Sequence, residues 1–241
     1  MTGAPGIGRR RAFDYPYVRP DASFVLDPRT GVTRSATTHD VAGALGDPDR
    51  DAVLAIGSNA APSQLCLKFA GRLTVGSPIV VARATWIDHD AVFAARIASY
   101  GAVPATFTAS PGTSLGAFVT FVDRAQLARL DETEGVSRVD PAYVRVEVRN
   151  HEVHIDGAGR LGTVWAYEAN PGPLLVDGHP IALAALTATH RRFDAWNEFD
   201  VLALLARRSD LSVDDFVDRL QADRTFRARM HATLAAGVTT R

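Results

Sequence analysis

Residues 78–123 constrain the fold most, because their pattern predicts several strands in succession with no helix between them. β-Branched and aromatic residues dominate this stretch, and glycine and proline interrupt it, which is typical of strands separated by turns. The chain is therefore expected to build a sheet from strands that neighbour one another in sequence. The predicted strands of this stretch are residues 79–86, 92–95, 106–109 and 116–122.

The segment before this stretch combines a strand, a tight turn and a helix. A short apolar run over residues 52–56 predicts a buried strand, and the turn residues Gly57, Ser58 and Asn59 end it. A helix is expected over residues 64–69, with a proline in its first turn.

The remainder of the chain places further strands before a group of helices. Asp123 can cap a helix over residues 124–132, and Gly135 is expected to end it. Strands coming first and helices last predict an α+β core with a helical C-terminal extension. The later strands are predicted at residues 143–148, 152–155 and 163–167, and the later helices near residues 180–191, 197–207, 213–220 and 223–236.

The N-terminal residues 1–48 are expected to form a largely irregular arm. They are rich in glycine, proline, aspartate, arginine and threonine and contain only short apolar islands, so they offer little burial to offset the entropy of ordering. The aromatic residues Phe13, Tyr15 and Tyr17 are candidates for anchoring part of this arm onto the domain.

Composition narrows the class of protein and of partner. A hydrophobic content of 46% predicts a packed core, and a net charge of −1 without a long basic run makes nucleic acid an unexpected partner. The single cysteine, Cys66, excludes an internal disulfide and fits a reducing compartment. No apolar run approaches the ~20 residues that span a bilayer, so no membrane partner is expected and cytoplasmic localisation is the default.

Three tempting motifs are weak in their context. Residues 157–162 match the spacing of a dinucleotide-binding loop, but a strand pattern follows them where a helix is needed, which favours a hairpin. His151 and His154 would point to opposite faces of a strand, so no metal site is expected. Ser58 lacks the glycine elbow of a serine hydrolase, and no histidine is placed beside it by any visible pattern.

A pair of segments carries more weight. Residues 54–59 end a strand in a glycine turn, whose consecutive backbone N–H groups can receive a carboxylate or a developing oxyanion. Residues 130–136 place Glu134 at the end of a helix that a glycine stops. A carboxylate at such a place, facing an apolar interior, holds a proton more tightly and suits proton transfer.

These two segments resemble the γ-glutamylcyclotransferases and their plant and bacterial relatives. That family has a Tyr-Gly-Ser-Asn loop after its first strand and a Glu-Gly pair after a Leu-Asp helix. Residues 105–107 and 110–112, followed by Gly116 and a strand, are also similar to the family in order and spacing. The resemblance covers roughly residues 50–170.

The resemblance implies a fold for the three parts of the chain. Residues 49–175 are expected to form a small mixed β-barrel of the γ-glutamylcyclotransferase-like type. Residues 1–48 then precede it as the arm, and residues 176–241 follow it as the helical extension.

The resemblance also implies the site. The family's glutamate base falls on Glu134, and its loop falls on Gly57, Ser58 and Asn59. Ile56 stands where the family has the tyrosine that opens the loop, which removes a hydroxyl from the edge of the pocket. The expected substrate-binding residues are Ile56, Gly57, Ser58, Asn59 and Tyr143, beside the catalytic Glu134.

The implied reaction is cyclisation of a small-molecule γ-glutamyl amine or peptide to 5-oxoproline, with Glu134 as general base and acid and with neither cofactor nor metal. Two alternatives stay open. The Ile56 departure fits a non-catalytic ligand-binding or regulatory module on the same fold, and a related amide hydrolase would use water in place of the substrate's amine. The sequence does not decide the oligomeric state.

Overall fold

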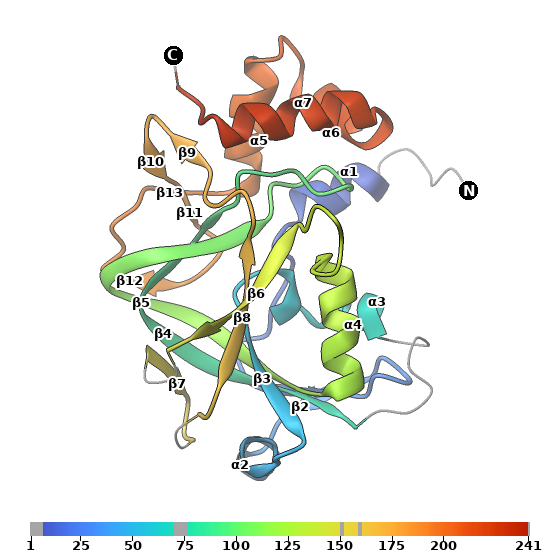
Figure 1. The fold of residues 1–241 in the computed structure, drawn as a ribbon, viewed down its shortest axis with the longest axis vertical. Coiled ribbons are helices and arrows are strands. Elements are labelled where there is room, and N and C mark those ends of the chain that lie inside the picture. The colour runs from blue at the N-terminus through green and yellow to red at the C-terminus, as the bar shows by residue number, and fades with distance from the viewer. Residues whose placement is uncertain (1–6, 70–76, 150–151, 159–160, 241) are drawn as a thin grey trace.

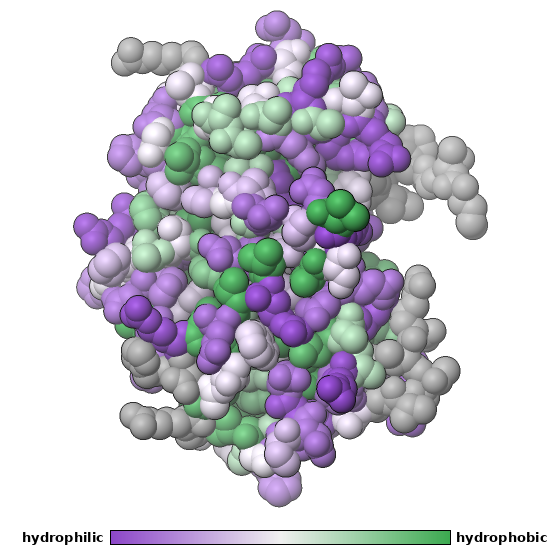
Figure 2. All heavy atoms as spheres, in the orientation of Figure 1, coloured by the Kyte–Doolittle hydropathy of each residue, from purple (hydrophilic) through white to green (hydrophobic). Residues whose placement is uncertain are grey.

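The computed structural model describes residues 7–69, 77–149, 152–158 and 161–240. These residues form one large mixed sheet and one two-stranded sheet, with helices along one side of the large sheet and the C-terminal helices at one end (Figure 1). The α+β class predicted from the order of the elements is thereby confirmed. On the face shown in Figure 2, hydrophobic residues occur in small groups among hydrophilic ones. No helix in the described part of the chain has the length and hydropathy needed to span a membrane.

Two long antiparallel strands, β4 (Ile79–Phe93) and β5 (Ala105–Asp123), form the centre of the sheet. Four short strands were expected here, and the structure corrects this to two. The turn-forming residues that suggested the breaks form an irregularity inside the pair: the register shifts beyond Ile87, and the Gly112 N–H donates to Asp88 Oδ1 at 2.7 Å. Both residues have a positive φ, which glycine and aspartate tolerate better than most residues.

The strand order is β13-β11-β4-β5-β3-β8-β6, and it is an open path among the described residues. β3 (Arg50–Ala55) lies antiparallel to β5 and parallel to β8 (Val164–Ala169), and β6 (Tyr143–Val148) forms the outer edge. No pairing of described residues joins the two ends of this path. The expected small closed barrel is therefore not confirmed, and the observed form is a large mixed sheet.

Residues 7–48 contain helices and strands, which corrects the prediction of an irregular arm for this part of the chain. Its strand β1 (Phe24–Leu26) is fully buried and pairs with the beginning of β4, because the short apolar island completes the sheet there. The other elements of this segment are α1 (Ile7–Phe13), β2 (Thr33–Ser35) and α2 (Thr38–Gly46).

The C-terminal part contains three of the four predicted helices. The prediction of a helix near residues 180–191 is wrong, because this segment lies along the open edges of the two central strands. There the short strands β11 (Ala182–Leu183) and β12 (Ala188–Thr189) pair with β4 and β5. The helices are α5 (Glu198–Arg207), α6 (Val213–Ala222) and α7 (Arg224–Ala235).

The caps predicted for the helix before the candidate glutamate are present. Asp123 and Gln126 form a reciprocal capping box at the start of α4 (Arg124–Glu134), and Gly135 takes the left-handed conformation at its end. In the expected hairpin at residues 157–162, Gly159 and Arg160 lie outside the described residues, and strand β8 follows. The remaining elements are η1 (Ser58–Ala60), α3 (Pro62–Phe69), β7 (Val153–Ile155), β9 (Leu175–Val176), β10 (His179–Pro180) and β13 (Ala195–Trp196).

Helices α3 and α4 cover a second apolar cluster beside the main core. Leu65 and Phe69 from α3 meet Leu130 from α4 in this cluster, and all three are completely buried. These apolar contacts hold both helices against the sheet. They therefore also fix the positions of Lys68 and Glu134, which lie at the ends of α3 and α4.

We expect the first strand to contribute to the stability of the whole domain. Leu26→Ala removes a completely buried side chain and should lower the free energy of unfolding by about 2–5 kcal/mol. The matched control is Val32→Ala, because Val32 is mostly exposed near the same strand and should change little. Chemical denaturation measures both. A Leu26→Ala effect as small as that of Val32→Ala would contradict the packing of β1 in the core.

A buried carboxyl at the start of α5 makes stability depend on pH. Glu198 accepts a hydrogen bond from the Val103 N–H at 2.7 Å, and its other oxygen is buried without a partner in the described chain. Burial raises the pKa of Glu198 well above that of an ordinary carboxyl, against the opposing effect of the Val103 hydrogen bond. The folded state therefore favours the protonated form, so this contribution is fully present below about pH 4.5 and is lost as the pH rises through the folded pKa.

Glu198→Gln should remove this dependence. Between about pH 5 and about pH 8, the free energy of unfolding should fall less in Glu198→Gln than in the wild type, as measured by urea denaturation. Glu147→Gln, at an exposed position of β6, serves as the control and should keep the wild-type slope. Identical slopes in the wild type and Glu198→Gln would contradict the raised pKa.

Candidate active site

The loop after β3 brings unpaired backbone donors to the site. Among the described residues, none accepts a hydrogen bond from the N–H of Gly57, Ser58 or Asn59, whereas the N–H groups of Ala60 and Ala61 bond back to the loop. The loop therefore presents donors that an anionic group can use.

Glu134 is the last residue of α4, and its carboxylate reaches the end of this loop. Its Oε1 accepts a hydrogen bond from Asn59 Nδ2 at 3.1 Å and one from Lys68 Nζ at 2.5 Å. Lys68 Nζ also donates to Asn59 Oδ1 at 2.5 Å, so the three side chains form a closed triangle. The other oxygen of Glu134, Oε2, has no hydrogen-bond partner in the described chain, which leaves it available to a ligand.

The ion pair corrects the expectation that Glu134 faces purely apolar surroundings. The side chain of Glu134 is 13% exposed and that of Lys68 is 16% exposed, so both are largely shielded from water. Sequence reasoning missed Lys68. Its only signal was a position in the helix that follows the loop, and the contact with Glu134 depends on how α3 packs against α4.

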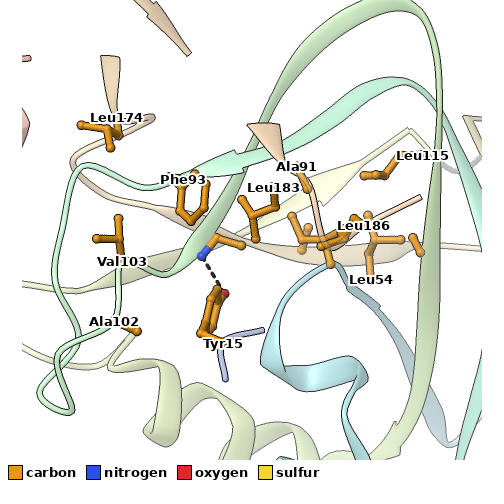
Figure 3. Close-up of a cluster of buried hydrophobic side chains, with 14 of the residues drawn as sticks. Tyr15, Leu54, Ala91, Phe93, Ala102, Val103, Leu115, Leu174, Leu183 and Leu186 are labelled. Atoms are coloured by element: carbon orange, nitrogen blue, oxygen red, sulfur yellow. Dashed lines mark hydrogen bonds between the residues drawn. The ribbon is translucent and has the colours of Figure 1, made fainter. Parts of the chain in front are cut away.

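Two tyrosine hydroxyls hold the first residue of β5 beside the loop. Tyr143 Oη donates to the Ala105 carbonyl at 3.0 Å, and Tyr15 Oη accepts from the Ala105 N–H at 2.6 Å. Burial raises the pKa of Tyr15, and burial followed by the nearby Glu134 charge raises that of Tyr143, so both hydroxyls stay protonated at neutral pH. Figure 3 shows the ring of Tyr15 beneath the buried side chains of Phe93 and Leu183.

Tyr15 also lies directly against the glycine of the loop. A Cβ placed on Gly57 would lie 2.7 Å from Tyr15 Oη and 3.4 Å from the Ala105 Cβ. The anchoring expected of the aromatic residues in the N-terminal segment is thus confirmed for Tyr15. Its position in the site was not foreseen, because nothing in the sequence connects residue 15 with residue 57.

All six residues predicted for the site line one cavity of about 1100 Å³. They are Ile56, Gly57, Ser58, Asn59, Glu134 and Tyr143. The cavity joins the loop, the end of α4 and the beginning of β6, which lie far apart in sequence. Their roles in binding and catalysis stay predictions.

Helix α7 lines the same cavity, so the C-terminal extension contributes to the site. Arg227 and His231 are among its lining residues, and His231 Nε2 lies 2.8 Å from the Ile97 carbonyl oxygen. Sequence analysis assigned no role to this extension. The described residues contain no group of three histidine, cysteine, aspartate or glutamate side chains that could hold a metal ion.

Comparison with solved structures gives matches of low identity. One is a γ-glutamyl cyclotransferase, with a TM-score of 0.40 and 16% identity over 76% of this chain and 99% of that protein. Others are an uncharacterised human protein, with a TM-score of 0.41 and 16% identity over 76% and 98% of the two chains, and an Arabidopsis thaliana protein, with a TM-score of 0.39 and 18% identity over 74% and 96%. No model of a known protein family matches the sequence, and a search of curated proteins gives no match.

The close approach of Tyr15 and Gly57 predicts a specific coupling. Gly57→Ala places a methyl group against Tyr15 Oη and should lower the free energy of unfolding by about 1–3 kcal/mol. In a Tyr15→Phe background the same substitution should cost clearly less, because the clashing oxygen is absent. A double-mutant cycle by chemical denaturation measures the difference.

Gly43→Ala is the matched control for this cycle. A Cβ at Gly43, within helix α2, meets nothing within 4 Å, so the substitution should be neutral or stabilising. Additive effects of Gly57→Ala and Tyr15→Phe would show that the two residues do not meet as described.

Proposed function

We propose that this protein is an enzyme that cyclises a γ-glutamyl amine or peptide to 5-oxoproline and releases the amine. The observation that carries the proposal is the meeting of one carboxylate, Glu134, with a loop of unpaired backbone donors in a single cavity. Proton transfer and anion binding can then act on one small substrate, as intramolecular aminolysis requires.

The proposed reaction forms one C–N bond and breaks another. The substrate's α-ammonium loses a proton to Glu134 Oε2, and the resulting amine attacks the γ-carbonyl carbon of the same molecule. The tetrahedral intermediate carries its negative charge on the former carbonyl oxygen. After the attack the ring nitrogen carries one proton too many, and it loses this proton as the intermediate collapses. The bond to the departing nitrogen breaks, Glu134 returns the first proton to that nitrogen, and the departing nitrogen also takes up the second, so the amine leaves as an ammonium ion.

The loop and the ion pair support different parts of this reaction. The N–H groups of Gly57 and Ser58 are available to hold the oxyanion or the substrate carboxylate, and one such donor typically contributes a few kcal/mol in comparable sites. Lys68 and Asn59 both contact Oε1, so they fix the carboxylate and leave Oε2 to exchange the proton. The Tyr15 hydroxyl accepts a hydrogen bond from Ala105, so its own proton remains free to be donated to a ligand beside Gly57.

The same ion pair favours one competing function. The charge of Glu134 is already balanced by Lys68 without a substrate, as expected of a structural pair in a non-catalytic ligand-binding module. In that alternative the cavity binds a ligand and transforms nothing. Substitution of Glu134 separates the two functions.

Glu134→Gln should strongly reduce turnover while the protein stays folded. The amide keeps the shape of the side chain but accepts no proton, so we expect 5-oxoproline formation to fall by ~10² or more. The assay incubates the protein with a panel of γ-glutamyl compounds and detects 5-oxoproline by mass spectrometry. The matched control is Glu132→Gln, two residues earlier on α4, whose side chain is 70% exposed and which should keep wild-type turnover.

Each result of this assay distinguishes the candidates. Turnover that survives Glu134→Gln would remove Glu134 from the role of base. No turnover of any γ-glutamyl compound by the wild type would favour the binding module. Ile56→Tyr is a companion variant at a buried cavity position, and a gain of turnover there would indicate that the isoleucine limits the activity.

A further inference from the structure

The charges that line the cavity are strongly unequal. Seven lysine and arginine side chains line it, against the two carboxylates of Glu134 and Asp140. Lys68 is paired with Glu134, and Arg129 is paired with Glu132. Within the described chain, the other five have no carboxylate at ion-pair distance: Arg11, Arg96, Arg138, Arg224 and Arg227.

Three of these arginines come from different segments of the cavity wall. The side chain of Arg138 lies against Gly135, the residue after Glu134. The guanidinium of Arg96 lies 5.3 Å from the centre of the ring of Tyr143, the first residue of β6. Arg227 comes from α7 and donates to the Leu220 carbonyl, and both Arg96 and Arg227 are half-buried.

A contact between α7 and the segment after β4 brings Arg96 and Arg227 to neighbouring parts of the cavity wall. His231 Nε2 lies 2.8 Å from the carbonyl oxygen of Ile97, the residue after Arg96, and Arg227 lies one helical turn before His231 on α7. Burial is the main cause that lowers the pKa of His231, and the positive charges of these two arginines add to the effect, while the Ile97 carbonyl and Asp140 oppose it. Half-buried like charges repel one another more strongly than in bulk water, because the local dielectric is lower. Guanidinium groups that outnumber the nearby carboxylates and form no ion pair are suited to a ligand that brings further negative charge.

We propose that Arg96, Arg138 and Arg227 form a second subsite of the cavity, which binds a phosphate-like group carrying at least two negative charges. Several guanidinium groups carry more positive charge than one carboxylate neutralises. Their planar N–H donors also match pairs of phosphate oxygens. The cavity, at about 1100 Å³, also exceeds the ~300–1,000 Å³ typical of small-molecule sites, so it has room for a ligand larger than a single amino acid. The subsite does not depend on the cyclisation chemistry.

The experiment titrates the full-length protein with inorganic pyrophosphate at constant ionic strength and measures binding by calorimetry. Wild type should bind saturably, whereas Arg96→Gln and Arg227→Gln should each raise the Kd at least tenfold. Arg229→Gln is the matched control, because Arg229 lies on the same helix, packs on Phe226 outside the cavity and should leave the Kd unchanged. Circular dichroism establishes that each variant is folded.

Arg138→Gln gives an independent readout, since Arg138 is exposed and its substitution does not threaten the core. It should also weaken pyrophosphate binding. Glu134→Gln should bind pyrophosphate at least as tightly as wild type, so failure of the cyclisation assay and failure of this proposal are separate results. No saturable binding by wild type at millimolar pyrophosphate, or equal weakening by Arg229→Gln and Arg227→Gln, would overturn the subsite.

Discussion

The antiparallel pairing of β4 with β5 is the interaction on which the rest of the structure depends. Its ladder runs along almost the full length of both strands, and β1, β7 and β11 attach to β4 while β3 and β12 attach to β5. Ala105, the first residue of β5, belongs to the same ladder. Its N–H donates a hydrogen bond to the hydroxyl of Tyr15, and its carbonyl accepts one from the hydroxyl of Tyr143. A shift of this register by one residue would turn the side chains of one strand to the opposite face of the sheet relative to its partner, and so expose side chains that now lie in the core.

The candidate site is assembled from segments that have no local reason to meet. The Gly57 loop follows β3, Glu134 ends α4, and Tyr15 comes from the N-terminal segment. Each is positioned by a different physical device: a strand end, a capped helix terminus and a buried aromatic ring. Such a site inherits the rigidity of the elements that carry it, which favours a fixed geometry between the carboxylate and the loop donors.

The wall of the cavity contains two regions that differ in their balance of charge. Around Glu134 the charges are matched, because Lys68 and Asn59 satisfy one carboxylate oxygen. Toward α7 they are unmatched, because Arg96 and Arg227 have no acidic partner in the described chain. The part of the cavity beside α7 is therefore expected to have a positive potential, and α7 joins this part of the wall to the C-terminal helices.

The sequence by itself determined the local structure around the candidate glutamate. Asp123, the apolar residues of α4 and Gly135 fixed the start, face and end of one helix, and the turn residues after β3 fixed the loop, because caps and glycine conformations act over a few residues. Only the tertiary structure decided that Leu26 completes the sheet, that Lys68 pairs with Glu134, and that α7 lines the cavity. These contacts join residues far apart in the chain, and their geometry follows from strand register and helix packing, which no short pattern of residues encodes.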